Sequence, residues 1–229
     1  MLDIEKGGIL LVNKPYEWTS FDVVKKIRNA LQKKYNRKIK VGHSGTLDPL
    51  ATGLLLVCVG KATKQIASFT NLNKEYTGTM FIGATTPSYD SETSIEESFP
   101  INHIDTLFIH DTARIFVGES KQTPPVHSAV KVGGRPAYKK ARKGQHVTIE
   151  PRSITIELFE ITDVQIPLVK FRVRCSKGTY IRSLAFDFGR ALGSGAYLHE
   201  LCRTHIGEFS LENALELDKL LEQINECKS

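Results

Sequence analysis

Residues 43–55 read HSGTLDPLATGLL and place a lone carboxylate, Asp48, in a glycine-punctuated loop ahead of an apolar strand. Because Asp48 precedes a proline, its backbone is biased toward an extended or turn conformation. Nearby cations are expected to favour its ionised form, and an ionised carboxylate can act as a nucleophile or a base. Asp-Pro dipeptides are also ordinary turn formers. Taken alone, the local pattern favours a simple turn.

Cations surround this loop along the chain. Asp48 is the only acidic residue in 23–74, and Glu150 is the only one in 121–152. The formal net charge is +6 and the isoelectric point is about 9.1. Lysine-rich helix faces are common on soluble proteins, but two long acid-poor segments favour a surface that binds phosphates.

The composition is that of a globular protein, since 41% of the 229 residues are hydrophobic and 24% are charged. The longest apolar run, 54–59, is far shorter than the ~20 residues that cross a bilayer, and the N-terminus does not resemble a signal peptide. The four cysteines are scattered, with no Cys-x-x-Cys spacing. We therefore expect reduced thiols, no metal site and a cytoplasmic location.

Hydrophobic periodicity gives a mixed α/β (α+β) chain. Strands are predicted at 8–13, 54–59, 75–82, 146–149, 153–164, 169–176 and 204–210. Helices are predicted at 20–31 (with Phe21, Val24, Ile27 and Leu31 at helical spacing), 62–69, 103–115, 136–143, 178–192 and 214–224. Loops are predicted at 40–49, 83–101 and 121–136. Because strands follow strands in the middle, we expect one domain over 1–229, with a mixed, mostly antiparallel central sheet flanked by helices.

Two familiar catalytic motifs fail on inspection. Residues 60–63 read GKAT, but a phosphate-binding loop needs Ser or Thr directly after the lysine. Residues 42–45 read GHSG, and a nucleophile elbow needs its second glycine one residue later. Nucleotide-dependent and serine-hydrolase chemistry are therefore disfavoured.

The longer pattern is more specific. Residues 43–55, followed by GKATK at 60–64, closely resemble the aspartate motif of the TruB family of tRNA pseudouridine synthases. Other motifs of that family are matched in order by Gly8-Ile9-Leu10 with Lys14-Pro15 and Thr19-Ser20, by Lys74-Glu75-Tyr76, by an insert from Pro124-Pro125 through Lys131 to Arg142, and by 176–182 (SKGTYIR). The resemblance runs from Gly8 to about Phe209, and five collinear motifs are strong evidence where one tripeptide is weak.

The resemblance implies a pseudouridine synthase fold with an RNA-binding insert, and isomerisation of uridine 55 in the T loop of tRNA to pseudouridine. It implies base flipping of the target uridine, no cofactor, and a monomer whose partner is the tRNA T stem-loop. Asp48 would be the catalytic carboxylate, and Arg182 would pair with it. Tyr76 would stack on the uracil, Tyr180 and Leu201 would line its pocket, and His43 would contact the RNA near the flipped base. The RNA-binding cations would be Lys64, Lys74, Lys131 and Arg142.

This chain departs from the family pattern at four places. We expect no C-terminal RNA-binding PUA domain. Glu17 stands where the family usually has glycine, and Cys202 replaces a usual arginine. Residues 86–90 (TPSYD) diverge from the family's loop, where Asp90 could orient Arg182.

Three rival functions remain. They are a catalytically silent RNA-binding or RNA-folding protein on the same scaffold, a synthase that acts on another RNA, and a phosphate-binding metabolic enzyme. Retention of Asp48 argues against the first, the matched insert against the second, and the failed loop motifs against the third.

Overall fold

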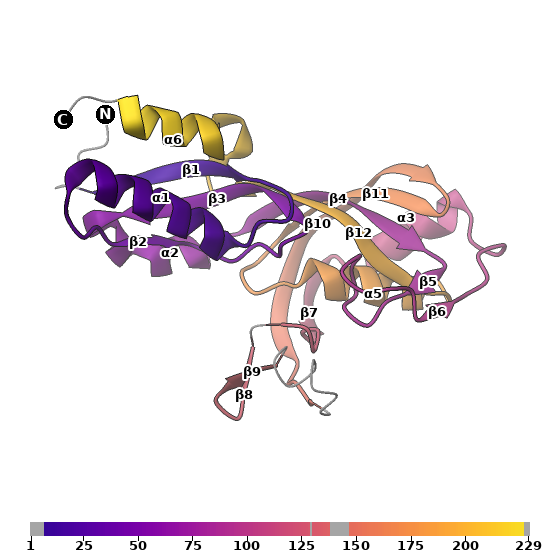
Figure 1. Ribbon diagram of the computed structural model, residues 1–229. Helices are drawn as coiled ribbons and strands as arrows, with labels where there is room; N and C mark the ends of the chain where they lie inside the picture. The colour runs from indigo at the N-terminus through magenta and orange to yellow at the C-terminus, as the bar shows by residue number, and fades with distance from the viewer. Residues whose placement is uncertain (1–6, 129, 138–146, 227–229) are drawn as a thin grey trace. The chain divides into compact units, whose positions relative to one another are not determined.

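A computed structural model describes residues 7–128, 130–137 and 147–226 (Figure 1). The chain forms two compact units. Unit 1 comprises Met1–Tyr76 and Leu201–Ser229, and unit 2 comprises Thr77–Glu200. Strands β4 and β12 each contribute residues to both units. The expectation of a single catalytic domain stays a prediction.

Unit 1 is built around β3 (Ala51–Val59). One edge of β3 pairs antiparallel with β1 (Gly8–Lys14), which pairs in turn with the parallel strand β14 (Leu215–Glu216). The C-terminal part of β12 (Ala196–Ile206) runs parallel to β3 at 51–53, and β2 (Val41–His43) pairs with 57–59. β13 (Phe209–Ser210) extends β12 antiparallel.

Both faces of β3 are buried, which explains its unbroken apolar sequence. One face packs on α1 (Ser20–Tyr35) and α6 (Leu217–Glu226), through Leu55, Val57 and Val59. The other face presents Leu54 and Leu56 to Phe69 and Leu72, at the end of α2 (Ile66–Asn71). A 3-10 helix, η1 (Gly60–Gln65), connects β3 to α2.

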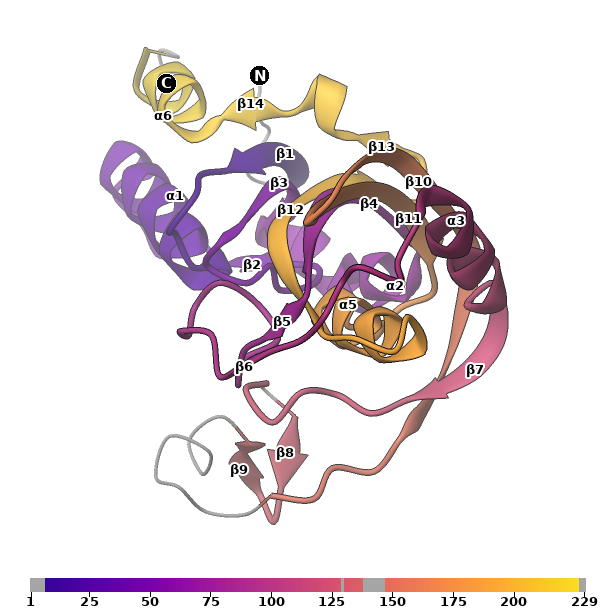
Figure 2. The ribbon, with the colours of Figure 1, turned by 90° about the vertical axis from the view of Figure 1, so that its right-hand side faces the viewer.

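The strands of unit 2 follow the order β4-β11-β10-β7. They are β4 (Lys74–Ile82), β7 (Gly118–Gln122), β10 (Arg152–Gln165) and β11 (Leu168–Cys175). The helices are α3 (Thr106–Ile115) and α5 (Ile181–Ala191). Figure 2 shows α5 inside the curve of these strands, beside α3. An aromatic core joins them, in which Phe159 packs edge-on against Phe116, Phe171 and Phe188.

Two short hairpins complete unit 2. One is β5 (Ala84–Thr85) with β6 (Glu97–Ser98), and the other is β8 (Lys131–Val132) with β9 (Arg135–Pro136). Within the described residues of both units, no helix has the length and apolar character that crossing a bilayer requires.

The expected fold class is confirmed, with a mixed, mostly antiparallel sheet and flanking helices. Several boundaries were wrong. Residues 41–43 form β2 instead of a loop, and β12 begins at 196 instead of 204. The last helix begins at 217, because residues 215 and 216 pair with β1. The Phe21 side chain is 59% exposed, and Val23 is buried in its place.

Other corrections fall in unit 2. The predicted loop 83–101 contains a hairpin and the buried side chains of Thr86, Ser88 and Asp90. The predicted loop 121–136 contains the end of β7 and the β8–β9 hairpin, and 147–149 is not a strand. Most of the predicted helix 136–143 lies outside the described residues.

A capping box holds the start of α1. The Thr19 hydroxyl accepts from the Asp22 N–H at 3.0 Å, and the Asp22 carboxylate accepts from the Thr19 N–H at 3.1 Å. We expect Thr19→Ala to lower the free energy of unfolding by about 1 kcal/mol, measured by urea denaturation. Thr106→Ala, at an exposed first position of α3, serves as the control and should change it by less than about 0.5 kcal/mol. Equal losses in both variants would contradict the capping role.

Candidate active site

Asp48 lies in the loop between β2 and β3. At the start of the loop, the Ser44 N–H donates to the Leu56 carbonyl at 3.0 Å. At its end, the Ala51 N–H donates to the Asp48 carbonyl at 3.1 Å, which closes a four-residue turn with Pro49 at its second position. Proline favours that position because its φ is already fixed. The turn interpretation of the sequence is therefore correct, and it positions the carboxylate without excluding a chemical role.

The first residue of α1 fixes the same loop from another side. Ser20 is buried, its hydroxyl donates to the Leu47 carbonyl at 3.1 Å, and it accepts from the Leu47 N–H at 2.8 Å. Both backbone groups of the residue before Asp48 are thus satisfied by one side chain. This contact ties the entry of α1 to the position of the carboxylate.

Lys14, at the end of β1, is completely buried beside the loop. Its ammonium donates to the carbonyls of Pro15 at 2.8 Å, Trp18 at 2.6 Å and Pro49 at 3.1 Å. A lysine ammonium has three N–H donors, and each of them has an acceptor here. Since Pro49 directly follows Asp48, Lys14 links β1 to the turn that carries the carboxylate.

Burial lowers the pKa of Lys14 from its ordinary value of 10.5 to about 8. The negative charge of Asp48 opposes this change, and the positive charge of Arg203 adds to it. Asp48 therefore lies within electrostatic reach of Lys14, and opposite charge nearby favours an ionised carboxylate.

Arg203, on β12, is also a buried cation of unit 1 and is only 1% exposed. Its Nε donates to the Leu54 carbonyl at 2.8 Å, and its Nη2 donates to the Gly45 carbonyl at 3.1 Å. It thereby joins the Asp48 loop to β3. The position opposite it, Gly53, has φ of +101°, and a Cβ there would lie 2.4 Å from the Arg203 carbonyl oxygen. Only glycine lets β12 approach β3 this closely.

The same parallel pairing positions Leu201. Its register partner on β3 is Ala51, three residues after Asp48, and the Thr52 hydroxyl donates to the Leu201 carbonyl at 3.5 Å. Leu201 is half-buried. The structure thus brings the predicted pocket leucine next to the end of the Asp48 turn.

Glu17 occupies the turn where the family usually has glycine. Its φ is +65°, in the left-handed region that glycine favours, and its N–H donates to the Pro49 carbonyl at 3.0 Å. The turn is therefore kept in spite of the substitution, and Pro49 accepts from both Glu17 and Lys14.

His43 is the last residue of β2 and pairs with Val57. Burial lowers the pKa of its imidazole, and the charge of Arg203 lowers it further, while a hydrogen bond with the Gly45 backbone raises it. A lowered pKa leaves the ring uncharged at neutral pH, which suits stacking or hydrogen bonding to a base.

Tyr76 is buried near the start of β4, two residues after Lys74. Lys74 is also buried, and its ammonium donates to the carbonyls of Thr70 and Leu72, both at 2.6 Å. Lys74 thus holds the end of α2, and its role in RNA binding stays a prediction.

The other predicted RNA-binding cations are Lys64, Lys131 and Arg142. Lys64 is exposed on η1. Lys131 belongs to β8 in unit 2, and Arg142 lies outside the described residues.

Tyr180 belongs to unit 2, where it precedes α5. Its N–H donates to Gln122 Oε1 at 2.8 Å, and its carbonyl accepts from Gln122 Nε2 at 3.0 Å. The Arg152 guanidinium lies 5.3 Å from the centre of the Tyr180 ring, within range of a cation–π interaction. Gln122 and Arg152 therefore fix the backbone and the ring of this predicted substrate-binding residue.

Arg182 is buried at the start of α5. Its Nη1 donates to the carbonyls of Ser88 and His127, both at 3.1 Å, and its Nε lies 3.6 Å from Asp90 Oδ2. The Asp90 carboxylate also accepts from the Ser88 hydroxyl and from the Glu92 N–H. The divergent loop 86–90 thus holds the guanidinium, as expected for Asp90. The pairing of Arg182 with Asp48 stays a prediction.

Lys14 and Arg203 were not predicted as site residues. Lys14 follows a buried strand and precedes a proline, which is a weak sign of a buried strand end. The only sequence signal for Arg203 was its position in a segment where polar and apolar residues alternate. Within the residues that the structure describes, no cluster of three or more His, Cys, Asp or Glu side chains could hold a metal ion.

The buried ammonium of Lys14 predicts a rise in stability at alkaline pH. Its pKa is about 8 in the folded chain and 10.5 when unfolded, so between these values the unfolded state binds more protons. The cost of burying the charge is fully present below pH 8 and is relieved as the pH rises to 10.5. The unfolding free energy of the wild type minus that of Lys14→Met should therefore grow by up to about 3 kcal/mol over this range. Urea denaturation across the pH series measures it.

Lys26→Met, at an exposed lysine of α1, is the matched control for Lys14→Met. Its difference from the wild type should not change over the same pH range. A Lys14 difference that is equally flat would contradict the lowered pKa.

The buried pair of Asp90 and Arg182 gives a second prediction. Removing one partner of such a pair leaves a buried charge uncompensated, so Asp90→Asn should lower the free energy of unfolding by about 3 kcal/mol. Glu97→Gln removes the same charge from an exposed position on β6 and should have an effect below about 0.5 kcal/mol. Equal effects of the two variants in urea denaturation would show that Asp90 is not needed to hold Arg182.

Comparison with known proteins places these motifs in a family. The model of the TruB family pseudouridylate synthase (N terminal domain) matches residues 28–181. The chain is 51% identical over 221 residues to tRNA pseudouridine synthase B of Flavobacterium johnsoniae, covering 96% of each protein. It is 48% identical over 220 residues to tRNA pseudouridine synthase B of Chloroherpeton thalassium, covering 95% of this chain and 90% of that relative.

Solved structures agree with the sequence relatives. A crystal structure of a Cbf5-Nop10-Gar1 complex matches with a TM-score of 0.71 and 30% identity, over 96% of this chain and 54% of that chain. An H/ACA RNP bound to a substrate RNA containing 2'-deoxyuridine matches with a TM-score of 0.70 and 28% identity, over 96% of this chain and 53% of that chain. The chain thus spans about half the length of these solved chains. The resemblance first seen in the motifs is confirmed, and this chain belongs to the TruB family of pseudouridylate synthases.

Proposed function

We propose that this chain is a tRNA pseudouridine synthase that isomerises uridine 55 in the T loop of tRNA. The observation that carries the proposal is the position of Asp48. Its carboxylate lies in a fixed turn, within electrostatic reach of the buried cation Lys14, in a chain of the TruB family.

The reaction is an isomerisation. The bond between N1 of uracil and C1′ breaks, the uracil turns, and a bond forms between C5 and C1′. C5 loses its hydrogen as a proton and N1 gains one, so the chemistry is redox-neutral and needs no added group. The Asp48 carboxylate can attack C1′, attack C6 of uracil, or remove the 2′ hydrogen. Each route needs an ionised carboxylate, which the neighbouring positive charge of Lys14 favours.

The remaining residues of unit 1 support binding of the flipped base. A uridine inside a structured loop must be extruded at a cost of a few kcal/mol, and enzymes offset that cost with stacking and hydrogen bonds in a pocket. We assign stacking on the uracil to Tyr76, an apolar wall to Leu201 and a neutral contact with the RNA to His43. The lowered pKa of His43 supports the last assignment.

In unit 2 we assign substrate binding to Tyr180 and Arg182. The contacts of Gln122 with the Tyr180 backbone, and of Asp90 with Arg182, keep both side chains in one arrangement before any RNA arrives. Such preorganisation reduces the entropy lost on binding. We further propose that the T stem-loop is the bound part of the tRNA, that Lys64, Lys74, Lys131 and Arg142 contact it, and that the enzyme acts as a monomer in the cytoplasm.

The central prediction concerns Asp48. Asp48→Asn and Asp48→Ala should abolish release of tritium from C5-labelled uridine in a T stem-loop transcript, because each variant removes the ionised carboxylate. Binding of the RNA, measured by filter retention, should persist. The wild type should be active in the presence of a chelator and without added nucleotide.

Asp218→Asn, at an exposed aspartate of α6, is the control and should retain wild-type tritium release. Activity that survives Asp48→Ala would contradict the catalytic role of the Asp48 carboxylate. Tight binding without any turnover by the wild type would instead support a catalytically silent RNA-binding protein.

A further inference from the structure

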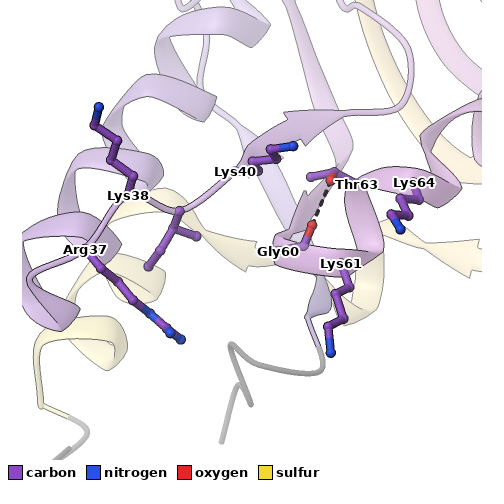
Figure 3. Close-up of a pocket in the computed structure, with 8 residues that line it drawn as sticks. Arg37, Lys38, Lys40, Gly60, Lys61, Thr63 and Lys64 are labelled. Atoms are coloured by element: carbon purple, nitrogen blue, oxygen red, sulfur yellow. Dashed lines mark hydrogen bonds between the residues drawn. The ribbon is translucent and has the colours of Figure 1, made fainter.

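A cationic pocket lies in unit 1 at the opposite end of β3 from the Asp48 turn. Its hollow has a volume of about 420 Å³ and lies between the segment after α1 and the 3-10 helix η1. The lining residues are Arg37, Lys38, Ile39, Lys40, Gly60, Lys61, Thr63 and Lys64 (Figure 3). We call it the η1 pocket.

The backbone holds the two walls of the η1 pocket together. The Gly60 N–H donates to the Lys40 carbonyl at 2.8 Å, and the adjacent residues Val41 of β2 and Val59 of β3 are register partners. The Thr63 hydroxyl donates to the Gly60 carbonyl at 2.7 Å, and Ile39 is buried in the core. The pocket is therefore a fixed feature of the fold, although its charged side chains reach into solvent.

The charge of the η1 pocket is of one sign. Among the residues that the structure describes, eight line the pocket, of which five are lysine or arginine and none is acidic. In the part of the chain that the structure describes, none of Lys38, Lys40, Lys61 and Lys64 is paired with a carboxylate. Like charges held this close repel each other, so an anion that enters the pocket relieves a repulsion that is already present.

The chemistry of the walls indicates which kind of anion fits. Figure 3 shows Arg37 and Lys61 extending from opposite sides of the hollow. Its described lining holds no aromatic side chain and thus no surface on which a base could stack. Pockets for small apolar ligands are lined mostly by hydrophobic and aromatic residues, and Ile39 is the one large apolar residue among the described lining residues. A phosphate backbone matches these walls better than a nucleobase or a metabolite.

The length of β3 sets the distance between the η1 pocket and the Asp48 turn. β3 has nine residues, beginning at Ala51 beside the Asp48 turn and ending at Val59 beside the η1 pocket. At about 3.3 Å per residue the strand separates the two sites by roughly 25 Å. An RNA duplex is A-form and advances less per base pair than the ~3.4 Å of B-form DNA, so this length corresponds to more than about seven base pairs. An RNA whose target base reaches Asp48 can therefore contact the pocket only through nucleotides well outside the target loop.

We propose that the η1 pocket binds backbone phosphates of a base-paired RNA stem, more than about seven base pairs from the nucleotide that enters the active site. The pocket contributes affinity that depends on salt but not on sequence. The identity of the stem as part of tRNA rests on the proposed function.

The test compares two double variants in RNA binding, measured by fluorescence anisotropy across a salt series. Arg37→Ala with Lys61→Ala removes two cations from opposite walls of the pocket. Lys26→Ala with Lys33→Ala removes two exposed cations from α1 in the same unit and is the matched control. The probes are a full-length tRNA transcript and a T-loop hairpin trimmed to about three base pairs, too short to span the distance.

We expect the pocket variant to bind the full-length tRNA about tenfold more weakly, and its slope of log affinity against log salt to be smaller by about two. With the trimmed hairpin it should bind like the wild type, and the control should keep most of the wild-type slope with both RNAs. Equal losses in the two double variants, or an equal loss with both RNAs, would overturn the proposal. Tritium release by the wild type tests the proposed function separately, because the binding comparison does not depend on turnover.

Discussion

Two buried cations, Lys14 and Arg203, donate to backbone carbonyls around the Asp48 loop, and the arrangement of unit 1 depends on these bonds. Burying a charge is costly unless its donors are satisfied, so the carbonyls must be held where the two side chains need them. That requirement fixes the end of β1, the loop and the approach of β12 to β3. It also explains Gly53, since any Cβ there would collide with the Arg203 backbone.

Most of the fold could be predicted, because its main elements follow local periodicity. β1, α1, β3, β10 and β11 are all near their predicted bounds. The errors occur where pairing with a distant strand decides whether a segment becomes a strand. β2 is a strand only because β3 supplies a partner, and the first half of β12 lacks clean alternation, so neither had a local signal. Phe21 fits the apolar spacing of α1, but the face that packs on β1 and β3 includes Val23, two residues later and about 200° around the helix.

The candidate site was predictable to a different degree. Asp48 stands out because it is isolated among cations. The family motifs predicted the other site residues, Tyr76, Tyr180 and Arg182. The residues that hold these side chains were missed or only suggested. Sequence patterns treat a charged side chain as exposed, whereas Arg203 is fully enclosed and Gln122 acts through both ends of its amide. Such supporting contacts join segments far apart in the chain, so no local window contains them.

The structure also refines what the acid-poor segment 23–74 means. Its lysines do not form a single phosphate-binding surface, because burial separates them into two kinds. Lys74 donates to carbonyls inside the fold, as Lys14 does outside that segment, and both ammonium groups are buried. Arg37 and Lys61 extend into a hollow whose described lining residues include no acid. Net charge alone therefore does not distinguish cations that hold the fold from cations that line an open pocket, whereas the burial of each side chain does.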